Sequence, residues 1–179
     1  MTEKIIIAGS GGQGIIFAGE LLAEAGMRNG LNVSVLPSYG PEMRGGTAHS
    51  TVTLSTSEIY SPIQDTINIL ISLNLPSLER FFEMVEDNGL IIHNSSLGVS
   101  KKDFGKFKYF GLPLSEKASE LGDIRVTNII ALGALNKILN LVDEKFLRES
   151  LILKLSGKKQ NLIDLNLNAI TAGKDLVSD

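Results

Sequence analysis

The chain has 179 residues, a formal net charge of −3, 43% hydrophobic and 21% charged residues, and no cysteine. This length fits one domain, residues 1–179, and the charge predicts binding to neither nucleic acid nor an anionic membrane surface. The missing thiolates exclude disulfides, cysteine-bound zinc and iron–sulfur clusters. No apolar run reaches the roughly 20 residues of a membrane span, and the first residues lack a signal-peptide layout, so we expect a cytoplasmic protein.

Strands and helices are expected to alternate along the chain. Residues 4–8 are mostly isoleucine and predict a buried strand, and residues 15–28 predict a helix. Residues 32–36 predict a second strand, parallel to the first through a right-handed crossover. Further strands are expected at 47–55, 67–73, 90–92 and 107–110, and further helices at 114–121, 127–139, 144–155 and 160–177. This order predicts an α/β fold: a single-domain three-layer sandwich around a doubly wound, mostly parallel, Rossmann-like sheet.

For two of these strands the sequence also predicts the extent of burial, and for two helices it predicts a start or a packing contact. Residues 47–55 are mostly polar on one side and predict an exposed or edge strand, whereas residues 67–73 predict a central strand buried on both faces. Asn74 begins a helix, and Gly133 predicts close packing of the helix that contains it. One apolar helix face after Asn74 is expected to hold Leu78, Phe81, Phe82 and Val85.

A glycine-rich stretch, Gly9-Ser10-Gly11-Gly12-Gln13-Gly14, separates the first strand from the first helix. It matches the G-x-G-x-x-G pattern, whose glycines permit a tight turn, a close approach to the backbone and close packing of helix and strand. The free N–H groups and the dipole at the helix start suit a phosphate or carboxylate. A glycine turn that only packs is the alternative that a single match leaves open.

The second informative stretch is a loop, Pro-Ser-Tyr-Gly-Pro-Glu-Met-Arg-Gly-Gly, at residues 37–46. Because ligands collect at the carboxyl ends of parallel strands, this loop and the glycine turn are expected at one edge of the sheet. Arg44 is a candidate clamp for an anion, and Tyr39 offers apolar contact. The alternative is a rigid surface turn in which Arg44 pairs with Glu42 in solvent.

Other site chemistries do not fit the chain. A nicotinamide-binding unit needs an acid at the end of the second strand, which here reads Val35-Leu36-Pro37-Ser38, so bound NAD is not expected. Gly14 is not followed by the Lys-Ser/Thr of a nucleotide triphosphatase. The two histidines, His49 and His93, lack metal-ligand spacing and are interpreted as structural. We predict no catalytic residue and no metal site in this chain.

Several motifs together resemble the gamma subunit of 2-oxoacid:ferredoxin oxidoreductases. They are the glycine stretch 9–14, Ala18-Gly19, the loop and its continuation at 37–48, Ser61-Pro62, and the stretch 73–78. The form of the loop looks closest to that of 2-oxoglutarate-type enzymes. Length and element order agree with this family over the whole chain.

The resemblance implies a function that no spacing in the chain predicts. Enzymes of this family decarboxylate a 2-oxoacid oxidatively on thiamine diphosphate, pass electrons through iron–sulfur clusters to ferredoxin, and form an acyl-CoA. The resemblance implies that thiamine diphosphate and the clusters belong to alpha, beta and delta-type partner subunits, so that this chain is inactive alone. It implies a coenzyme A contact, carried to Gly9, Ser10, Gly11, Gly12, Gln13 and Gly14, and extended to Tyr39 and Arg44.

Two alternatives to this interpretation stay open. A stand-alone nucleotide- or CoA-binding Rossmann-like module would explain the glycine turn, although the loop at 37–46 disfavours it. An indolepyruvate-, pyruvate- or 2-oxoisovalerate-type subunit of the same family would share the chemistry and differ in substrate. Substrate choice is expected to lie mainly in the partner chains.

Overall fold

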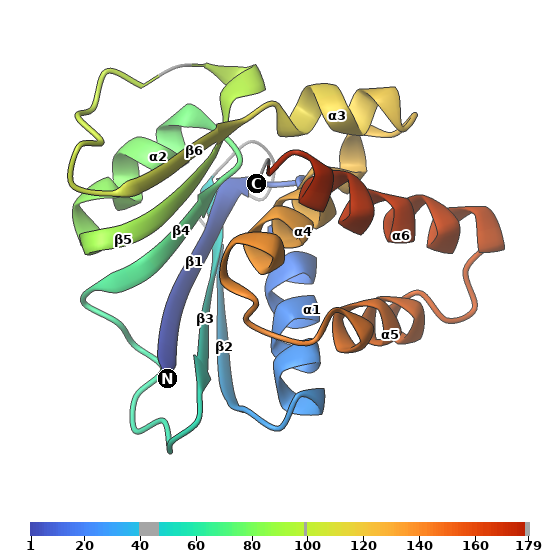
Figure 1. The fold of residues 1–179 in the computed structure, drawn as a ribbon, viewed down its shortest axis with the longest axis horizontal. Helices are drawn as coiled ribbons and strands as arrows, with labels where there is room; N and C mark the ends of the chain where they lie inside the picture. The colour runs from blue at the N-terminus through green and yellow to red at the C-terminus, as the bar shows by residue number, and fades with distance from the viewer. Residues whose placement is uncertain (40–46, 99, 178–179) are drawn as a thin grey trace.

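One six-stranded sheet runs through the middle of the computed structural model, which describes residues 1–39, 47–98 and 100–177 (Figure 1). The strands are β1 (Thr2–Ser10), β2 (Asn32–Tyr39), β3 (Thr47–Ser55), β4 (Ile67–Ser72), β5 (Val85–Asn94) and β6 (Lys108–Leu112). The helices are α1 (Ile15–Arg28), α2 (Leu75–Phe81), α3 (Leu114–Glu120), α4 (Thr127–Leu139), α5 (Glu144–Lys154) and α6 (Gln160–Asp175). Short 3₁₀ turns lie at η1 (Phe82–Met84), η2 (Ser95–Leu97) and η3 (Ile124–Val126). The α/β fold and the predicted order of elements are therefore confirmed.

The order of strands across the sheet is β2-β3-β1-β4-β5-β6. Strands β1, β4, β5 and β6 pair in parallel, whereas β3 runs antiparallel to both β1 and β2. Strand β2 therefore has the predicted direction relative to β1, but β3 separates the two. The prediction that residues 47–55 form an exposed or edge strand is wrong, because β3 lies inside the sheet and β2 and β6 form its edges.

Strand β3 is polar and nevertheless buried, and two of its buried hydroxyl groups have hydrogen-bond partners. Thr53 is 2% exposed, and its Oγ1 accepts a hydrogen bond from Gln64 Nε2 at 3.3 Å. Ser55 is 1% exposed, and its Oγ lies 2.9 Å from Thr2 Oγ1 on the neighbouring strand. Since hydrogen-bonded hydroxyl groups are tolerated in protein interiors, the polarity of this strand does not mark it as an edge.

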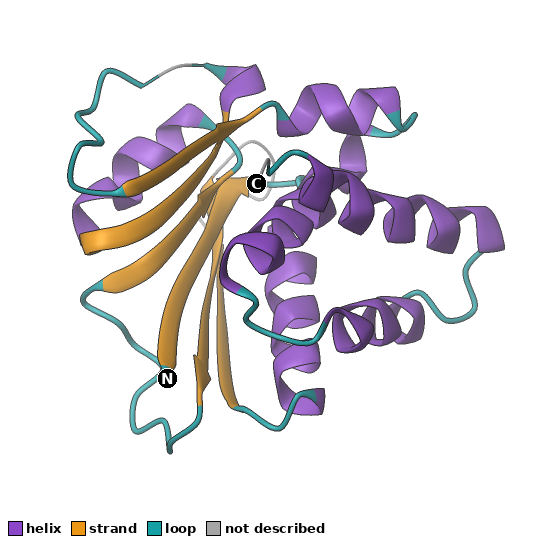
Figure 2. Ribbon diagram, viewed as in Figure 1, coloured by secondary structure: helices purple, strands orange, loops and turns teal. Residues whose placement is uncertain are grey.

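Helices cover both faces of the sheet, which gives the predicted three layers (Figure 2). Helix α2 packs on one face, over a cluster that includes Ile6 and Leu70. Helices α1 and α4 pack on the other face, over a larger cluster that includes Ile5, Ile7 and Ile71, with α5 and α6 outside them (Figure 1). Alternate residues of β1 thus enter opposite cores, as the two-residue period of a strand requires. Strand β4 is central and buried on both faces, as predicted.

The helix predicted to carry four apolar residues on one face is shorter than expected. Helix α2 ends at Phe81, Phe82 begins η1, and Val85 is the first residue of β5. All three residues, together with Leu78, still belong to one buried apolar cluster. Their spacing therefore reflects burial on a common side of the sheet, which a helix followed by a strand can also produce.

Helices α4 and α6 approach each other closely enough for their backbones to touch. A Cβ atom at Gly133 would collide with the carbonyl of Ile170, and one at Gly173 with the carbonyl of Ile130. The prediction of close packing at Gly133 is confirmed. No helix within the described ranges has both the length and the apolar character needed to cross a membrane.

Candidate functional site

The glycine turn joins the carboxyl end of β1 to the start of α1 and is closed by its own hydrogen bonds. The N–H of Ser10 donates to Gln13 Oε1 at 2.6 Å, and the N–H of Gln13 donates to the carbonyl of Ser10 at 3.1 Å. Gly12 and Gly14 have φ values of 95° and 68°, a backbone region that L side chains rarely adopt. The Gln13 side chain, predicted to contact a ligand, thus uses its oxygen to fix the shape of the turn.

Two asparagines from distant parts of the chain hold this turn in place. Asn74 donates from Nδ2 to Ser10 Oγ at 2.8 Å, while its Oδ1 caps α2 by accepting from the N–H of Ser77. Asn128, which is 4% exposed, donates from Nδ2 to the carbonyl of Gly14 at 2.8 Å. Neither asparagine is predicted as a site residue, although Asn74 lies in one of the motifs that carry the family resemblance.

The backbone of the turn presents a group of N–H donors to solvent. Within the described residues, the N–H groups of Gly11, Gly12 and Gly14 meet no acceptor. The N–H groups in the first turn of α1 have no partner inside the helix, and this turn contains no acidic residue. These donors and the positive end of the helix dipole together favour an oxyanion.

Tyr39 lines one cavity of about 290 Å³ together with four residues of the glycine turn: Ser10, Gly11, Gly12 and Gly14. Its remaining walls are apolar and come from the first residues of α1, Ile15, Ile16 and Phe17, and from Ala48. Tyr39 is 66% exposed at the end of β2 and faces this cavity from the other side of β3. The structure therefore brings Tyr39 together with the glycines, whereas Arg44 lies outside the described residues.

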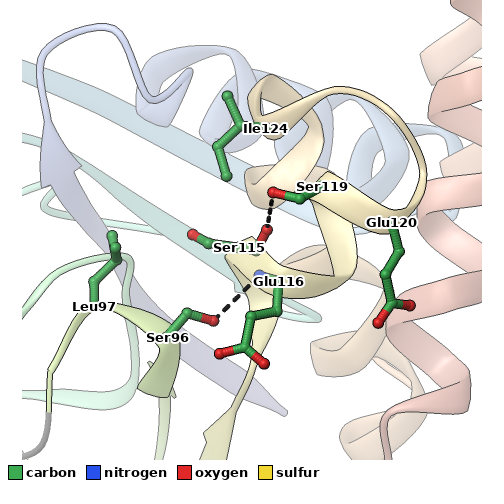
Figure 3. Close-up of a pocket in the computed structure, with 7 residues that line it drawn as sticks. All are labelled: Ser96, Leu97, Ser115, Glu116, Ser119, Glu120 and Ile124. Carbon is green, nitrogen blue, oxygen red and sulfur yellow. Dashed lines mark hydrogen bonds between the residues drawn. The ribbon is translucent and has the colours of Figure 1, made fainter.

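A second group of cavities continues from the other side of the turn. Gly12 and Gln13 line a small cavity of about 140 Å³ with Leu97, Ile124 and residues near α3 and α4. Leu97 and Ile124 also line a wider cavity of about 620 Å³, shown in Figure 3, where Ser96 Oγ accepts from the N–H of Glu116 at 3.2 Å. Glu116 and Glu120 are among the residues that line this wider cavity, and their negative charges disfavour a phosphate there. Of the cavities beside the turn, the wider one is therefore the least suited to an oxyanion.

A cation lies beside the turn on the α2 side of the sheet. Arg80 donates from Nη1 to Thr47 Oγ1 at 2.7 Å, and its guanidinium carbon lies 5.2 Å from the centre of the Phe81 ring. The Phe81 ring also packs against His49, with ring centres 4.9 Å apart. Burial lowers the pKa of His49, and the neighbouring charge of Arg80 lowers it further.

Because its pKa is lowered, the contribution of His49 to the stability of the fold depends on pH. Its pKa is lower in the folded chain than its ordinary value of 6.5, so the folded state binds the proton less well than the unfolded state does. The stability associated with neutral His49 is present above that ordinary value and is lost as the pH falls through the folded value. We expect Arg80→Gln to raise the pKa of His49, since it removes the like charge while burial still opposes protonation.

An NMR titration of the His49 ring protons measures this shift. Arg28→Gln is the matched control, because Arg28 pairs with Glu24 at 2.9 Å near the far end of α1. The control should leave the His49 titration where it is in the parent chain. A His49 titration that is identical in Arg80→Gln and the parent chain would contradict the placement of Arg80.

The second histidine has a structural setting. His93 is fully buried in β5, and its Nε2 lies 2.9 Å from the carbonyl of Gly98. Among residues 1–39, 47–98 and 100–177, no three histidine, aspartate or glutamate side chains gather as a metal site requires. The two histidines therefore do not belong to a metal-binding cluster within the described part of the chain.

The sequence of this chain matches a known protein family and its curated members. The family model for pyruvate ferredoxin/flavodoxin oxidoreductase matches residues 4–176. The ketoisovalerate oxidoreductase subunit VorA of Methanothermobacter thermautotrophicus is 36% identical over 173 residues, which are 96% of this chain and 36% of VorA. The chain thus spans about a third of the length of this curated relative.

Two solved structures share the fold over nearly the whole chain. The 2-oxoglutarate:ferredoxin oxidoreductase from Magnetococcus marinus, with 2-oxoglutarate, coenzyme A and succinyl-CoA bound, superposes with a TM-score of 0.90 at 29% identity. The match covers 98% of this chain and 31% of the Magnetococcus chain. The keto/oxoacid ferredoxin oxidoreductase gamma subunit from Geobacter sulfurreducens superposes with a TM-score of 0.84 at 26% identity, covering 98% and 96% of the two chains. The chain belongs to the pyruvate ferredoxin/flavodoxin oxidoreductase family, as a subunit of the gamma type.

Proposed function

We propose that this chain is the gamma subunit of a cytoplasmic 2-oxoacid:ferredoxin oxidoreductase and that its glycine turn helps to hold coenzyme A. The reaction converts a 2-oxoacid and coenzyme A into an acyl-CoA and carbon dioxide, and the electron pair released reduces ferredoxin. The observation that carries the proposal is the set of N–H groups at Gly11, Gly12 and Gly14 without an acceptor in the described chain, beside a partly apolar cavity.

The chemistry of this edge suits coenzyme A in two respects. Its phosphates match the N–H groups of the turn and the start of α1. Its adenine or pantetheine part has apolar surface to set against Ile15, Ile16, Phe17 and Tyr39, which line the same cavity. The related Magnetococcus enzyme holds coenzyme A, which supports this ligand. Gly9 and Ser10 shape the turn, and we extend the proposed contact to Arg44, which lies outside the described residues.

The catalytic cofactors of the reaction are assigned to other chains. We propose that thiamine diphosphate is bound by alpha and beta partner subunits, and that a delta-type subunit carries the iron–sulfur clusters that deliver electrons to ferredoxin. This chain has no cysteine to hold a cluster. VorA and the Magnetococcus chain are each about three times as long as the part that this chain matches, so both carry further sequence outside the matched part.

For the 2-oxoacid, we propose 2-oxoglutarate. The Pro-Ser-Tyr-Gly-Pro-Glu-Met-Arg-Gly-Gly stretch at residues 37–46, whose first three residues lie in β2 and not in the predicted loop, resembles that of 2-oxoglutarate-type enzymes. The similar Magnetococcus enzyme binds 2-oxoglutarate. The similarity to VorA makes ketoisovalerate the competing substrate. Turnover of the two acids by one purified complex decides between them.

The proposal predicts that activity requires assembly. Purification of the native complex under gentle conditions should return this chain with larger, cofactor-containing subunits. The isolated chain should not reduce a redox dye with 2-oxoglutarate and coenzyme A, because it has no cysteine to hold an iron–sulfur cluster and the proposal assigns thiamine diphosphate to the partner subunits. Subunits prepared without this chain should show a higher KM for coenzyme A, which addition of the chain lowers.

Two results would contradict this function. One is a native preparation in which this chain occurs alone. The other is a complex whose KM for coenzyme A is the same with and without the chain.

A further inference from the structure

Arg80 and the glycine turn both lie near the carboxyl end of β1, although the two are far apart in the sequence. Thr47, which accepts the hydrogen bond from Arg80 at 2.7 Å, is the register partner of Ser10 in the β1–β3 pairing. Asn74, at the start of the helix that carries Arg80, donates to the hydroxyl of Ser10 at 2.8 Å. One strand pairing and one helix therefore place the guanidinium next to the turn.

The charge of Arg80 is not neutralised within the described chain. Arg28, Arg125 and Arg148 each form an ion pair, with Glu24, Asp123 and Glu144 respectively. Arg80 forms no ion pair with any residue of the ranges 1–39, 47–98 and 100–177. Its nearest titratable neighbour on β3 is His49, whose lowered pKa leaves the ring uncharged near neutral pH. No acidic side chain of the described residues thus neutralises this exposed cation.

The guanidinium is held in a defined orientation. One N–H group donates to Thr47 Oγ1, and the Phe81 ring lies 5.2 Å from the guanidinium carbon. A guanidinium has five N–H donors, so four remain to form a planar, two-pronged contact with a carboxylate or phosphate. Because the side chain is already ordered, a ligand would lose less conformational entropy in recruiting it.

We propose that Arg80 is a second anchor for an oxyanion at this edge, acting from the α2 side while the N–H groups of the glycine turn act from the α1 side. The inference rests on the proposed function. It extends the ligand site to a residue outside the glycine stretch 9–14 and the stretch 37–46. The oxyanion is either a phosphate of coenzyme A or the carboxylate of the 2-oxoacid, and both offer the paired oxygens that a guanidinium binds.

Steady-state kinetics of the assembled complex carrying Arg80→Gln test this inference. Loss of a charge-assisted contact should raise one KM on the order of 10- to 100-fold, with kcat changed far less. A rise confined to coenzyme A identifies a phosphate, and a rise confined to the 2-oxoacid identifies a carboxylate. Arg80→Lys should recover part of the loss, since an ammonium keeps the charge but not the fork. Arg28→Gln, which removes an equal charge elsewhere, should leave both KM values unchanged.

Two outcomes overturn the inference. Equal KM values for both substrates in Arg80→Gln and Arg28→Gln leave Arg80 without a ligand. Loss of the other subunits from the Arg80→Gln complex during gel filtration shows that Arg80 pairs with a partner carboxylate instead. Failure of the proposed coenzyme A role is seen separately, as a complex in which Gly12→Asp leaves the KM for coenzyme A unchanged.

Discussion

Gly12→Asp should raise the KM for coenzyme A on the order of 100-fold while the chain stays folded. A carboxylate at this position enters the lining of both cavities that meet at the turn. A unit charge about 6 Å from a phosphate charge costs about 3 kcal/mol at an effective dielectric constant near 20. Steady-state kinetics of the assembled complex, with coenzyme A varied and the 2-oxoacid saturating, measure the effect.

Gly12→Asn is the matched control for this experiment. Gly12 has a φ of 95°, and a Cβ atom there would meet no heavy atom within 4 Å. Asn and Asp tolerate positive φ better than other L residues, so the two variants differ mainly in charge. We expect Gly12→Asn to change the KM only a few-fold by comparison. Equal KM values for the two variants would show that no anion binds at the turn.

Gly173→Ala should lower the free energy of unfolding by about 2–3 kcal/mol, the largest stability effect that we expect from adding a single methyl group. The new Cβ would collide with the carbonyl of Ile130 and lie 2.9 Å from the backbone nitrogen of Ala134. Both obstacles are backbone atoms of α4, so no change of side-chain rotamer can relieve the collision. Separation of α6 from α4 would outweigh the gain in helix propensity of about 1 kcal/mol. Urea unfolding followed by circular dichroism measures the change.

Asn168→Ala is the control for Gly173→Ala in the same helix. Asn168 is exposed in α6, so its replacement improves helix propensity without affecting the contact with α4. We expect this variant to match or slightly exceed the parent chain in stability. If Gly173→Ala were equally stable, the close contact between α4 and α6 would be wrong.

The fold could be predicted from the sequence wherever local pattern and burial agree. The Ile-rich residues 4–8 and 67–73 form central strands, and the helices after residue 114 begin and end close to their predicted bounds. The prediction failed for β3, because paired hydroxyl groups such as Thr53 make a buried strand resemble an exposed one. Sheet order depends on strand pairings that are distant in the chain, which local periodicity does not encode.

The candidate site could be predicted only where one motif contains it. The glycine turn is contiguous in sequence. Because it lies between a predicted strand and a predicted helix, its pattern predicts a tight turn with free N–H groups at the helix start. Asn128 contacts Gly14 across 114 positions of sequence, and the spacing of neither residue indicates this contact. Arg80 bonds to Thr47, which lies opposite Ser10 only through the register of β1 with β3, the strand whose position was predicted incorrectly.

Hydrogen–deuterium exchange of the assembled complex tests most directly whether coenzyme A is held at the glycine turn. The N–H groups of Gly11, Gly12 and Gly14 have no acceptor in the described chain, so they should exchange quickly without ligand. Rapid-mixing labelling should show slower exchange in peptides covering residues 9–17 when coenzyme A is added, and no such change with pantetheine, which lacks the phosphates. Unchanged exchange at residues 9–17, with protection by coenzyme A confined to other subunits, would contradict the claim.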